Sequence, residues 1–184
     1  MGRPAPGPFA SVQYLRGAAV QLLARRGLTR GPDVLLGVIY DPLLKQLFWA
    51  EKGRGAFLNG KKLHVSPVPH LAESLITTGF AYKMRGLEKR ILGMFHRILR
   101  STFAVRRPGS AALDLAFLAA GFTDGHYEYG LHPWDVAAGI LLVREAGGQV
   151  VLPHNDFYRV QEGLCVADNG RIHKEFMRLL LAQK

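Results

Sequence analysis

The sequence predicts a layered fold of the α+β or α/β class, with helices packed on β-sheets. Residues 35–65 alternate short apolar runs with turn residues, which predicts an antiparallel meander. From residue 75 onward helical and strand patterns alternate, which favours helices packed on a mixed sheet. The chain has 184 residues, of which 48% are apolar, enough for one domain with a substantial core.

Charge and cysteine content exclude several classes of protein. The only cysteine, Cys165, excludes an intramolecular disulfide framework and a multi-cysteine zinc site. No apolar run approaches the ~18–20 residues that span a bilayer, so we expect no membrane association. The formal net charge is +10, but no aromatic-basic RNA motif, helix-turn-helix signature or zinc finger accompanies it. Nucleic acid is therefore not the expected partner.

Residues 1–32 are predicted to be a basic, Gly/Pro/Arg-rich segment that precedes a domain formed by residues 33–184. The segment has five arginines and no acidic residue, and residues 1–10 predict a flexible lead. Apolar residues between positions 12 and 23 have helical spacing, typical of an amphipathic surface helix. An organelle transit peptide is the alternative interpretation of such an Arg-rich start. We favour the surface helix and a cytoplasmic protein.

Each strand of the meander is bounded by a turn. The predicted strands are residues 35–40, 46–51, 56–58 and 61–65. Asp41-Pro42 turns the chain after the first strand, and Gly53 and Gly55 mark the next turn. Asn59-Gly60 is a strong hairpin signal because both residues tolerate positive φ.

The second half contains the remaining elements. Its predicted strands are residues 75–80, 103–106, 123–127, 149–152 and 163–167, and its predicted helices are centred on 91–99 and span 110–120, 133–145 and 171–182. Ser110 can cap one helix, which Gly121 ends, and Pro133 suits the first position of another. The helix around residues 91–99 has an apolar stripe, and its opposite face is interpreted as solvated. That face carries Lys89, Arg90, Arg97 and Arg100.

Two stretches carry residues suited to chemistry. Gly109-Ser110 opens a helix directly after a strand, where free backbone N–H groups favour an anion, although plain helix capping is the commoner role. Asp135 lies in the first turn of a helix, where a carboxylate complements the helix dipole and can also ligate a hard metal ion. His126 and His132 lack the partners of a metal cluster, and we interpret Cys165 as a core residue.

These motifs resemble a known family. GSAALDLAFLAAG followed by GLHPWDVAAGILLVREAGGQV resembles the C-terminal half of bacterial-type inositol monophosphatases. GVIYDPLLKQLFWAEKGRGAFLNGKKLHVS resembles the meander of that family, so the likeness covers roughly four fifths of the chain. The resemblance implies a sandwich of sheets and helices, a homodimer, and Mg²⁺-dependent hydrolysis of a phosphomonoester. Inositol-1-phosphate is the default substrate, with other sugar phosphates as alternatives.

The resemblance also implies roles for particular residues. Asp135 matches a metal-binding aspartate, and Glu128 matches the carboxylate that hydrogen-bonds the inositol ring. Gly109, Ser110 and Ala111 match the segment that contacts substrate hydroxyl groups.

The family motif Asp-Pro-Ile/Leu-Asp-Gly-Thr, which holds the first metal, is absent. Asp41-Pro42-Leu43-Leu44 does not replace it, because this stretch lies within the meander and lacks the second aspartate and the Gly-Thr pair. The water-activating residues are therefore unassigned. We expect an N-terminally truncated version of the fold with impaired activity. The alternative is an inactive remnant or binding subunit, associating with RNA or the transcription machinery.

Overall fold

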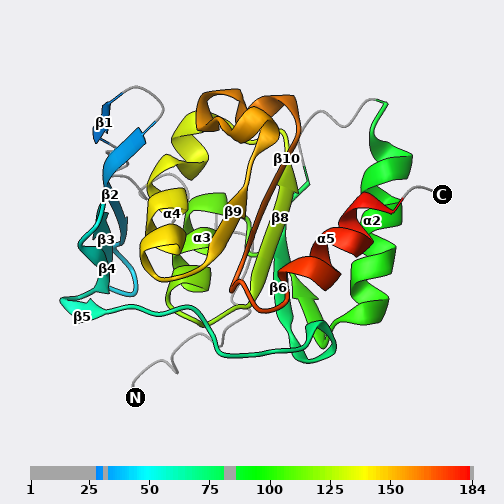
Figure 1. Cartoon of the computed structure of the whole chain (residues 1–184), viewed down its shortest axis with the longest axis horizontal. Coiled ribbons are helices and arrows are strands. Elements are labelled where there is room, and N and C mark those ends of the chain that lie inside the picture. Colours follow the sequence, from blue (N-terminus) through cyan, green and yellow to red (C-terminus); the bar gives the residue numbers. More distant parts are fainter. Residues whose placement is uncertain (1–27, 31–32, 81–85, 183–184) are drawn as a thin grey trace, which may run out of the picture.

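The structure, a computed structural model, describes residues 28–30, 33–80 and 86–182. These residues form four layers: a first sheet, helices α3 and α4, a second sheet, and helices α2 and α5 (Figure 1). The helices are α2 (Glu88–Ser101), α3 (Ala111–Ala119), α4 (Pro133–Glu145) and α5 (His173–Leu181). The layered architecture predicted from the sequence is confirmed.

The first sheet is the predicted antiparallel meander, with its strands in chain order. Its strands are β1 (Leu28–Arg30), β2 (Asp33–Asp41), β3 (Gln46–Glu51), β4 (Gly55–Leu58) and β5 (Lys61–Lys62). Asn59 and Gly60 have φ values of 48° and 81°, as the Asn-Gly hairpin signal predicts. The strand predicted at 61–65 ends early because the chain leaves the sheet, and Val65 N–H instead donates to the Ala146 carbonyl at 3.1 Å.

Strand β1 was not predicted. It pairs with β2 and lies inside residues 1–32, so the first sheet extends into the segment that sequence analysis separated from the domain. Three residues give too short a pattern for a strand assignment, and contacts with distant residues stabilise them: the pairing with β2, and a hydrogen bond between the Thr29 and Tyr158 hydroxyls at 3.1 Å. The flexible lead at 1–10 and the helix expected around residues 12–23 lie outside the described residues.

The second sheet is mixed, as predicted, with the order β7-β6-β8-β10-β9. Its strands are β6 (Leu75–Thr78), β7 (Ala104–Arg106), β8 (Gly125–Tyr129), β9 (Gln149–Val151) and β10 (Leu164–Asp168). Strand β6 is parallel to β7 and β8, and the other pairs are antiparallel. The strand predicted at 75–80 ends at Thr78, and Gly79 then lies against the Glu128 carboxylate with no room for a Cβ atom.

The two helical layers differ in composition because they differ in surroundings. Helices α3 and α4 lie between the sheets and are buried on most sides, so they are apolar nearly all round (Figure 1). Helices α2 and α5 cover the outer face of the second sheet and keep one charged face in solvent. None of the described helices has the length and apolarity needed to cross a membrane.

Two hydrophobic cores result from this layering. One includes Phe48, Leu115 and Leu142, between the two sheets. The other includes Ile76, Met94 and Phe176, between the second sheet and the outer helices. Three short 3₁₀ segments, Leu71–Glu73, Pro153–Asn155 and Phe157–Glu162, connect the elements.

Gly139 allows α3 and α4 to approach closely, so Gly139→Ala is expected to destabilise the fold by about 1–3 kcal/mol through overpacking. A Cβ atom at this position would lie 2.6 Å from Leu115 Cβ. The matched control is Gly93→Ala in α2, where a Cβ meets only the end of the Arg97 side chain at 3.4 Å. That variant is expected to be neutral or up to ~1 kcal/mol more stable, because alanine favours helix. Urea unfolding checks both; equal effects would contradict the close-approach explanation.

Candidate functional site

Gly109, Ser110 and Ala111 together form the start of α3. Gly109 has a φ of 99°, which favours glycine, and Ser110 is the extended N-cap residue. The Ser110 hydroxyl accepts a hydrogen bond from Leu113 N–H at 3.5 Å, so the predicted capping role is confirmed. A helix start of this kind presents backbone N–H groups that can bind an anion or a hydroxyl oxygen.

Glu128 projects from β8 toward the layer that contains α3. Residues alternate between the faces of a strand, so His126 and Glu128 share one face while Tyr127 and Tyr129 pack on the outer-helix side. The Glu128 side chain is only 14% exposed. Burial raises its pKa to about 7, with Arg107 opposing and the Asp135 carboxylate adding to the rise. The structure therefore brings Glu128, Arg107 and Asp135 within electrostatic reach of one another.

Asp114 is a further buried carboxyl beside this cluster, and it was not predicted as a site residue. Its side chain lies on α3 and its Oδ1 has no hydrogen-bond partner among the described residues. Burial raises the pKa of Asp114, the charge of Glu128 raises it further, and Arg107 opposes both. An acidic residue within the apolar helix stretch LDLAFLAA was a usable signal, because unpaired carboxyls are rarely buried.

His126 is completely buried next to Glu128. Its Nδ1 lies 3.0 Å from the Thr77 hydroxyl, and its Nε2 lies 3.7 Å from Glu128 Oε2, beyond hydrogen-bonding distance. Burial lowers the pKa of His126 to about 4, so the ring is neutral at pH 7. Cys165, on the neighbouring strand β10, is buried in the core as expected, and burial raises its pKa to about 12.

Asp135 begins helix α4 together with Pro133, which occupies a first-turn position as predicted. Asp135 Oδ2 accepts a hydrogen bond from His132 N–H at 3.0 Å, so the carboxylate helps to satisfy the helix start. The His132 ring stacks on Trp134 with centroids 4.5 Å apart, and its Nδ1 lies 3.3 Å from Gln161 Oε1. His132 is therefore engaged with neighbouring side chains.

Magnesium fits this donor set only in part. Mg²⁺ usually takes one or two protein carboxylates together with substrate phosphate oxygens and waters. Asp135 is half-exposed and can supply one carboxylate, whereas Asp114 is buried and Glu128 mostly so. Across residues 28–30, 33–80 and 86–182, no group of three or more His, Cys, Asp or Glu side chains is placed to hold a metal. These residues do not by themselves complete a metal site.

Two further acidic residues of the motifs have structural contacts. Glu145 accepts hydrogen bonds from Gly53 N–H at 2.8 Å and Gly55 N–H at 2.9 Å, which ties the end of α4 to the β3–β4 turn. Asp41 Oδ1 accepts from Leu43 N–H and Leu44 N–H within its own turn. Asp41 thus stabilises the turn that follows β2.

Comparisons with known proteins agree with this architecture. The profile of the inositol monophosphatase family matches residues 14–183. An inositol-1-monophosphatase from Caulobacter vibrioides is 38% identical over 83% of this chain and 60% of its own length. The Nus factor SuhB of Escherichia coli K12 is 38% identical over 95% of this chain and 64% of its own length.

Solved structures give the same result. The inositol monophosphatase of Anabaena aligns with a TM-score of 0.78 and 41% identity, covering 84% of this chain and 64% of that one. The SuhB protein of Bartonella henselae aligns with a TM-score of 0.77 and 39% identity, covering 83% and 58%. The chain spans between about half and two thirds of the length of the curated relatives it matches. Sequence and fold together place this chain in the inositol monophosphatase family.

Proposed function

We propose that this chain recognises a phosphomonoester of the inositol-1-phosphate class and that its reaction is Mg²⁺-dependent hydrolysis to inositol and phosphate. The observation that carries the proposal is the convergence of three charged residues near the start of α3: Arg107 of the β7–α3 loop, Glu128 of β8 and Asp135 of α4. Gly109, Ser110 and Ala111 present the α3 start to the substrate hydroxyl groups in this proposal. Family membership supports the phosphatase class.

The residues of this cluster have complementary tasks in the proposal. Backbone N–H groups at the α3 start donate hydrogen bonds to ligand oxygens, and Glu128 accepts hydrogen bonds from ring hydroxyls. The pKa of Glu128 is about 7, so both its neutral and its ionised forms are populated near neutral pH. Ligand hydroxyls that donate hydrogen bonds to the carboxylate stabilise the ionised form. The exposed Arg107 adds a positive charge suited to a phosphate. Mg²⁺, when bound, activates a water and shields phosphate charge, with Asp135 among its ligands.

Turnover by this chain is expected to be slow, because Asp135 is the one metal carboxylate that the resemblance assigns here. Without the remaining metal ligands several kcal/mol of transition-state stabilisation are lost, so we expect at least about a hundredfold less activity than in a relative that carries the complete Asp-Pro-Ile/Leu-Asp-Gly-Thr motif. We also propose that the chain is cytoplasmic and that it forms a homodimer. Sedimentation equilibrium tests the homodimer directly.

The test measures phosphate release from inositol-1-phosphate across a Mg²⁺ titration, with binding of the same compound followed by NMR. Mg²⁺-dependent release that disappears in Asp135→Asn is the expected result. Glu175→Gln, an exposed site on α5, is the control and should leave release unchanged. Release that is unaffected by Asp135→Asn would contradict the metal role, and binding without release would contradict hydrolysis.

The second candidate is a non-catalytic binding subunit associated with RNA or the transcription machinery. Relatives that bear the name Nus factor SuhB and the formal charge of +10 favour it. Absence of phosphate release from a folded chain, together with RNA binding that persists above ~0.2 M salt, would support this function over hydrolysis.

A further inference from the structure

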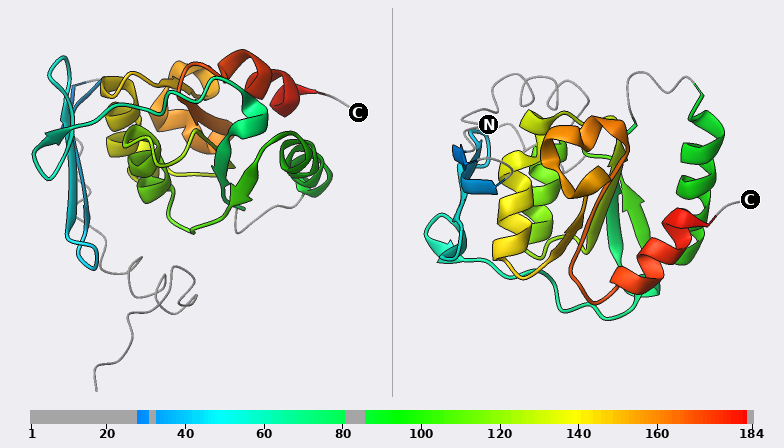
Figure 2. Two further views of the ribbon diagram at one scale, coloured as in Figure 1. Left: turned by 90° about the horizontal axis from the view of Figure 1, so that it is seen from below. Right: turned by 45° about the horizontal axis from the view of Figure 1, so that its top comes forward.

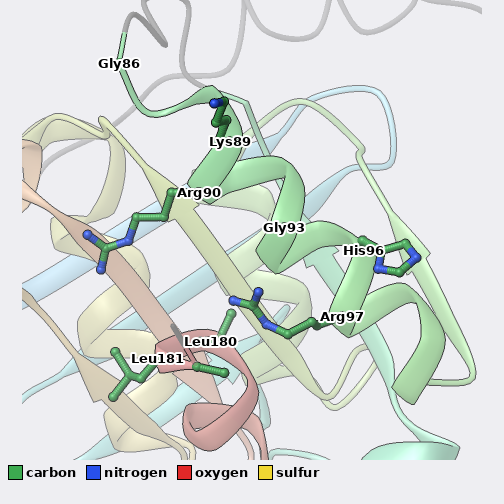
Figure 3. A pocket seen from close by; sticks show the side chains of 9 residues that line it. Gly86, Lys89, Arg90, Gly93, His96, Arg97, Leu180 and Leu181 are labelled. Carbon is green, nitrogen blue, oxygen red and sulfur yellow. The ribbon is translucent and has the colours of Figure 1, made fainter. Parts of the chain in front are cut away.

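A cavity of about 530 Å³ opens between α2 and α5, on the outer side of the second sheet (Figure 3). Helices α2 and α5, which carry its lining residues, lie across that sheet from α3 and α4 (Figure 2), so the cavity is separate from the site around Glu128. Its lining residues are Gly86, Lys89, Arg90, Gly93, His96, Arg97, Leu180, Leu181 and Ala182. The inference below is therefore independent of the proposed function.

The cavity is lined by basic side chains. Lys89 and His96 lie seven residues apart on α2, as do Arg90 and Arg97, so each pair is two turns apart on the same side of the helix, and none of the described lining residues is acidic. Among residues 28–30, 33–80 and 86–182, no carboxylate forms a salt bridge with Lys89, Arg90 or Arg97. Like charges on one helix face destabilise the helix, so an anion bound here would offset that repulsion.

Arg97 is held in place by the protein itself. Its Nε donates a hydrogen bond to the Leu179 carbonyl at 2.8 Å, near the end of α5, where backbone carbonyls lack helical partners. Gly93, one turn earlier, leaves room for the guanidinium, whose Nη1 lies 3.4 Å from where a Cβ would be. Figure 3 shows the Arg97 side chain extending from α2 toward α5. A pre-oriented guanidinium loses little entropy on binding a phosphate.

The basic cavity continues into an apolar one. A second cavity of about 510 Å³ shares Arg90 and Leu181 with the first. Its walls are mainly apolar and include Tyr129, Val151 and Met177, and Arg90 lies over the Tyr129 ring at 5.7 Å from the centroid. The acidic lining residue Glu162 is paired with Arg159. Leu181 is 56% exposed at the junction, although it is a large apolar side chain. The two cavities together offer a charged end and an apolar end.

We propose that this groove binds a small, soluble organic phosphate. The phosphate lies in the basic cavity, where Lys89 and Arg97 donate charge-assisted hydrogen bonds. The organic group covers Leu181 and extends toward Tyr129. Both features are needed, because the cations alone would bind any anion and the apolar walls alone give no orientation.

The test compares phenyl phosphate, inorganic phosphate and phenol as probes, with affinities from calorimetry in low-salt buffer. Phenyl phosphate is expected to bind the full chain more tightly than the other two. The double variant Lys89→Gln/Arg97→Gln is expected to weaken it at least tenfold. The control, Arg100→Gln/Lys174→Gln, removes the same amount of charge from α2 and α5 at positions outside the cavity. It is expected to change the affinity for phenyl phosphate less than twofold.

A second variant keeps the test valid if Arg97→Gln loosens the end of α5. Leu181→Ser is expected to weaken phenyl phosphate about threefold and leave inorganic phosphate unchanged. Equal losses in both double variants would show non-specific charge attraction and overturn the proposal. Loss of phenyl phosphate binding in Glu128→Gln, with none in Lys89→Gln/Arg97→Gln, would place the ligand at the other site and also overturn it.

Discussion

At pH 8, Glu128→Gln is expected to be up to about 3 kcal/mol more stable than the unmodified chain, whereas at pH 4 the two should be nearly equal. The cause is the buried carboxyl, whose pKa rises from 4.5 to about 7 in the folded protein. Between these values the folded state binds more protons than the unfolded state, so stability falls as pH rises from about 4.5 to 7. A neutral glutamine avoids this penalty.

Urea unfolding between pH 4 and pH 8 checks this result. Glu162→Gln is the control, and its stability relative to the unmodified chain should change with pH in the opposite direction. Hydrogen bonds from Arg159 lower the pKa of Glu162, so this carboxylate stabilises the fold only when it is ionised. Asp114 also favours low pH, and because the charge of Glu128 raises the pKa of Asp114, Glu128→Gln relieves part of that penalty too, which adds to the difference at pH 8. Lower stability of Glu128→Gln at pH 8 would mean that attraction from Arg107 outweighs burial.

Asp124→Ala is expected to destabilise the fold by about 4 kcal/mol, because it leaves two buried donors without acceptors. The Asp124 carboxylate accepts hydrogen bonds from the Ser66 hydroxyl and from Leu75 N–H, the latter at 2.6 Å. Asn169 donates to Ser66 Oγ at 3.0 Å and to the Val68 carbonyl at 2.9 Å. This network joins the segment between β5 and β6 to the first residue of β6, to the residue before β8 and to the loop between β10 and α5.

Asp156→Ala is the matched control for this network. Asp156 accepts from Tyr158 N–H at 2.9 Å, a local cap at the edge of a 3₁₀ segment, so its loss should cost about 1 kcal/mol. Asp124→Asn keeps one acceptor oxygen and should fall between the two. Chemical unfolding at pH 7 measures all three variants. Similar losses at Asp124 and Asp156 would show that the buried network contributes no more than a local cap.

Local chemistry accounts for the elements that the sequence predicted well. The Asn59-Gly60 hairpin, the Ser110 cap and the Pro133 helix start each depend on residues within a turn of one another. The sequences of helices α3 and α4 are also apolar nearly all round, because helices between two sheets expose few residues to solvent. The family resemblance covers the same local motifs.

Contacts between distant residues account for what the sequence did not predict. Strand β1 exists through pairing with β2, and the Glu145 contacts to Gly53 and Gly55 bridge about 90 residues. Ser66 and Asn169 are 103 residues apart, yet share a hydrogen bond. No local pattern encodes such pairs, since a side chain's partner depends on how the layers stack.

The sequence by itself determined the layered class, the hairpin and helix starts, and the identity of the residues beside the α3 start. The class, the hairpin and the helix starts follow from backbone preferences and apolar periodicity, which act over a few residues, whereas the residues beside the α3 start were indicated by the family resemblance of their motifs. The tertiary structure alone decided that Glu128 is buried against Gly79 within electrostatic reach of Arg107 and Asp135, and that Lys89 and Arg97, on the solvated side of α2, also line a cavity. Burial and the distances between charged groups determine the pKa of a side chain and which ligand it can bind. Burial and these distances are established only when the layers pack.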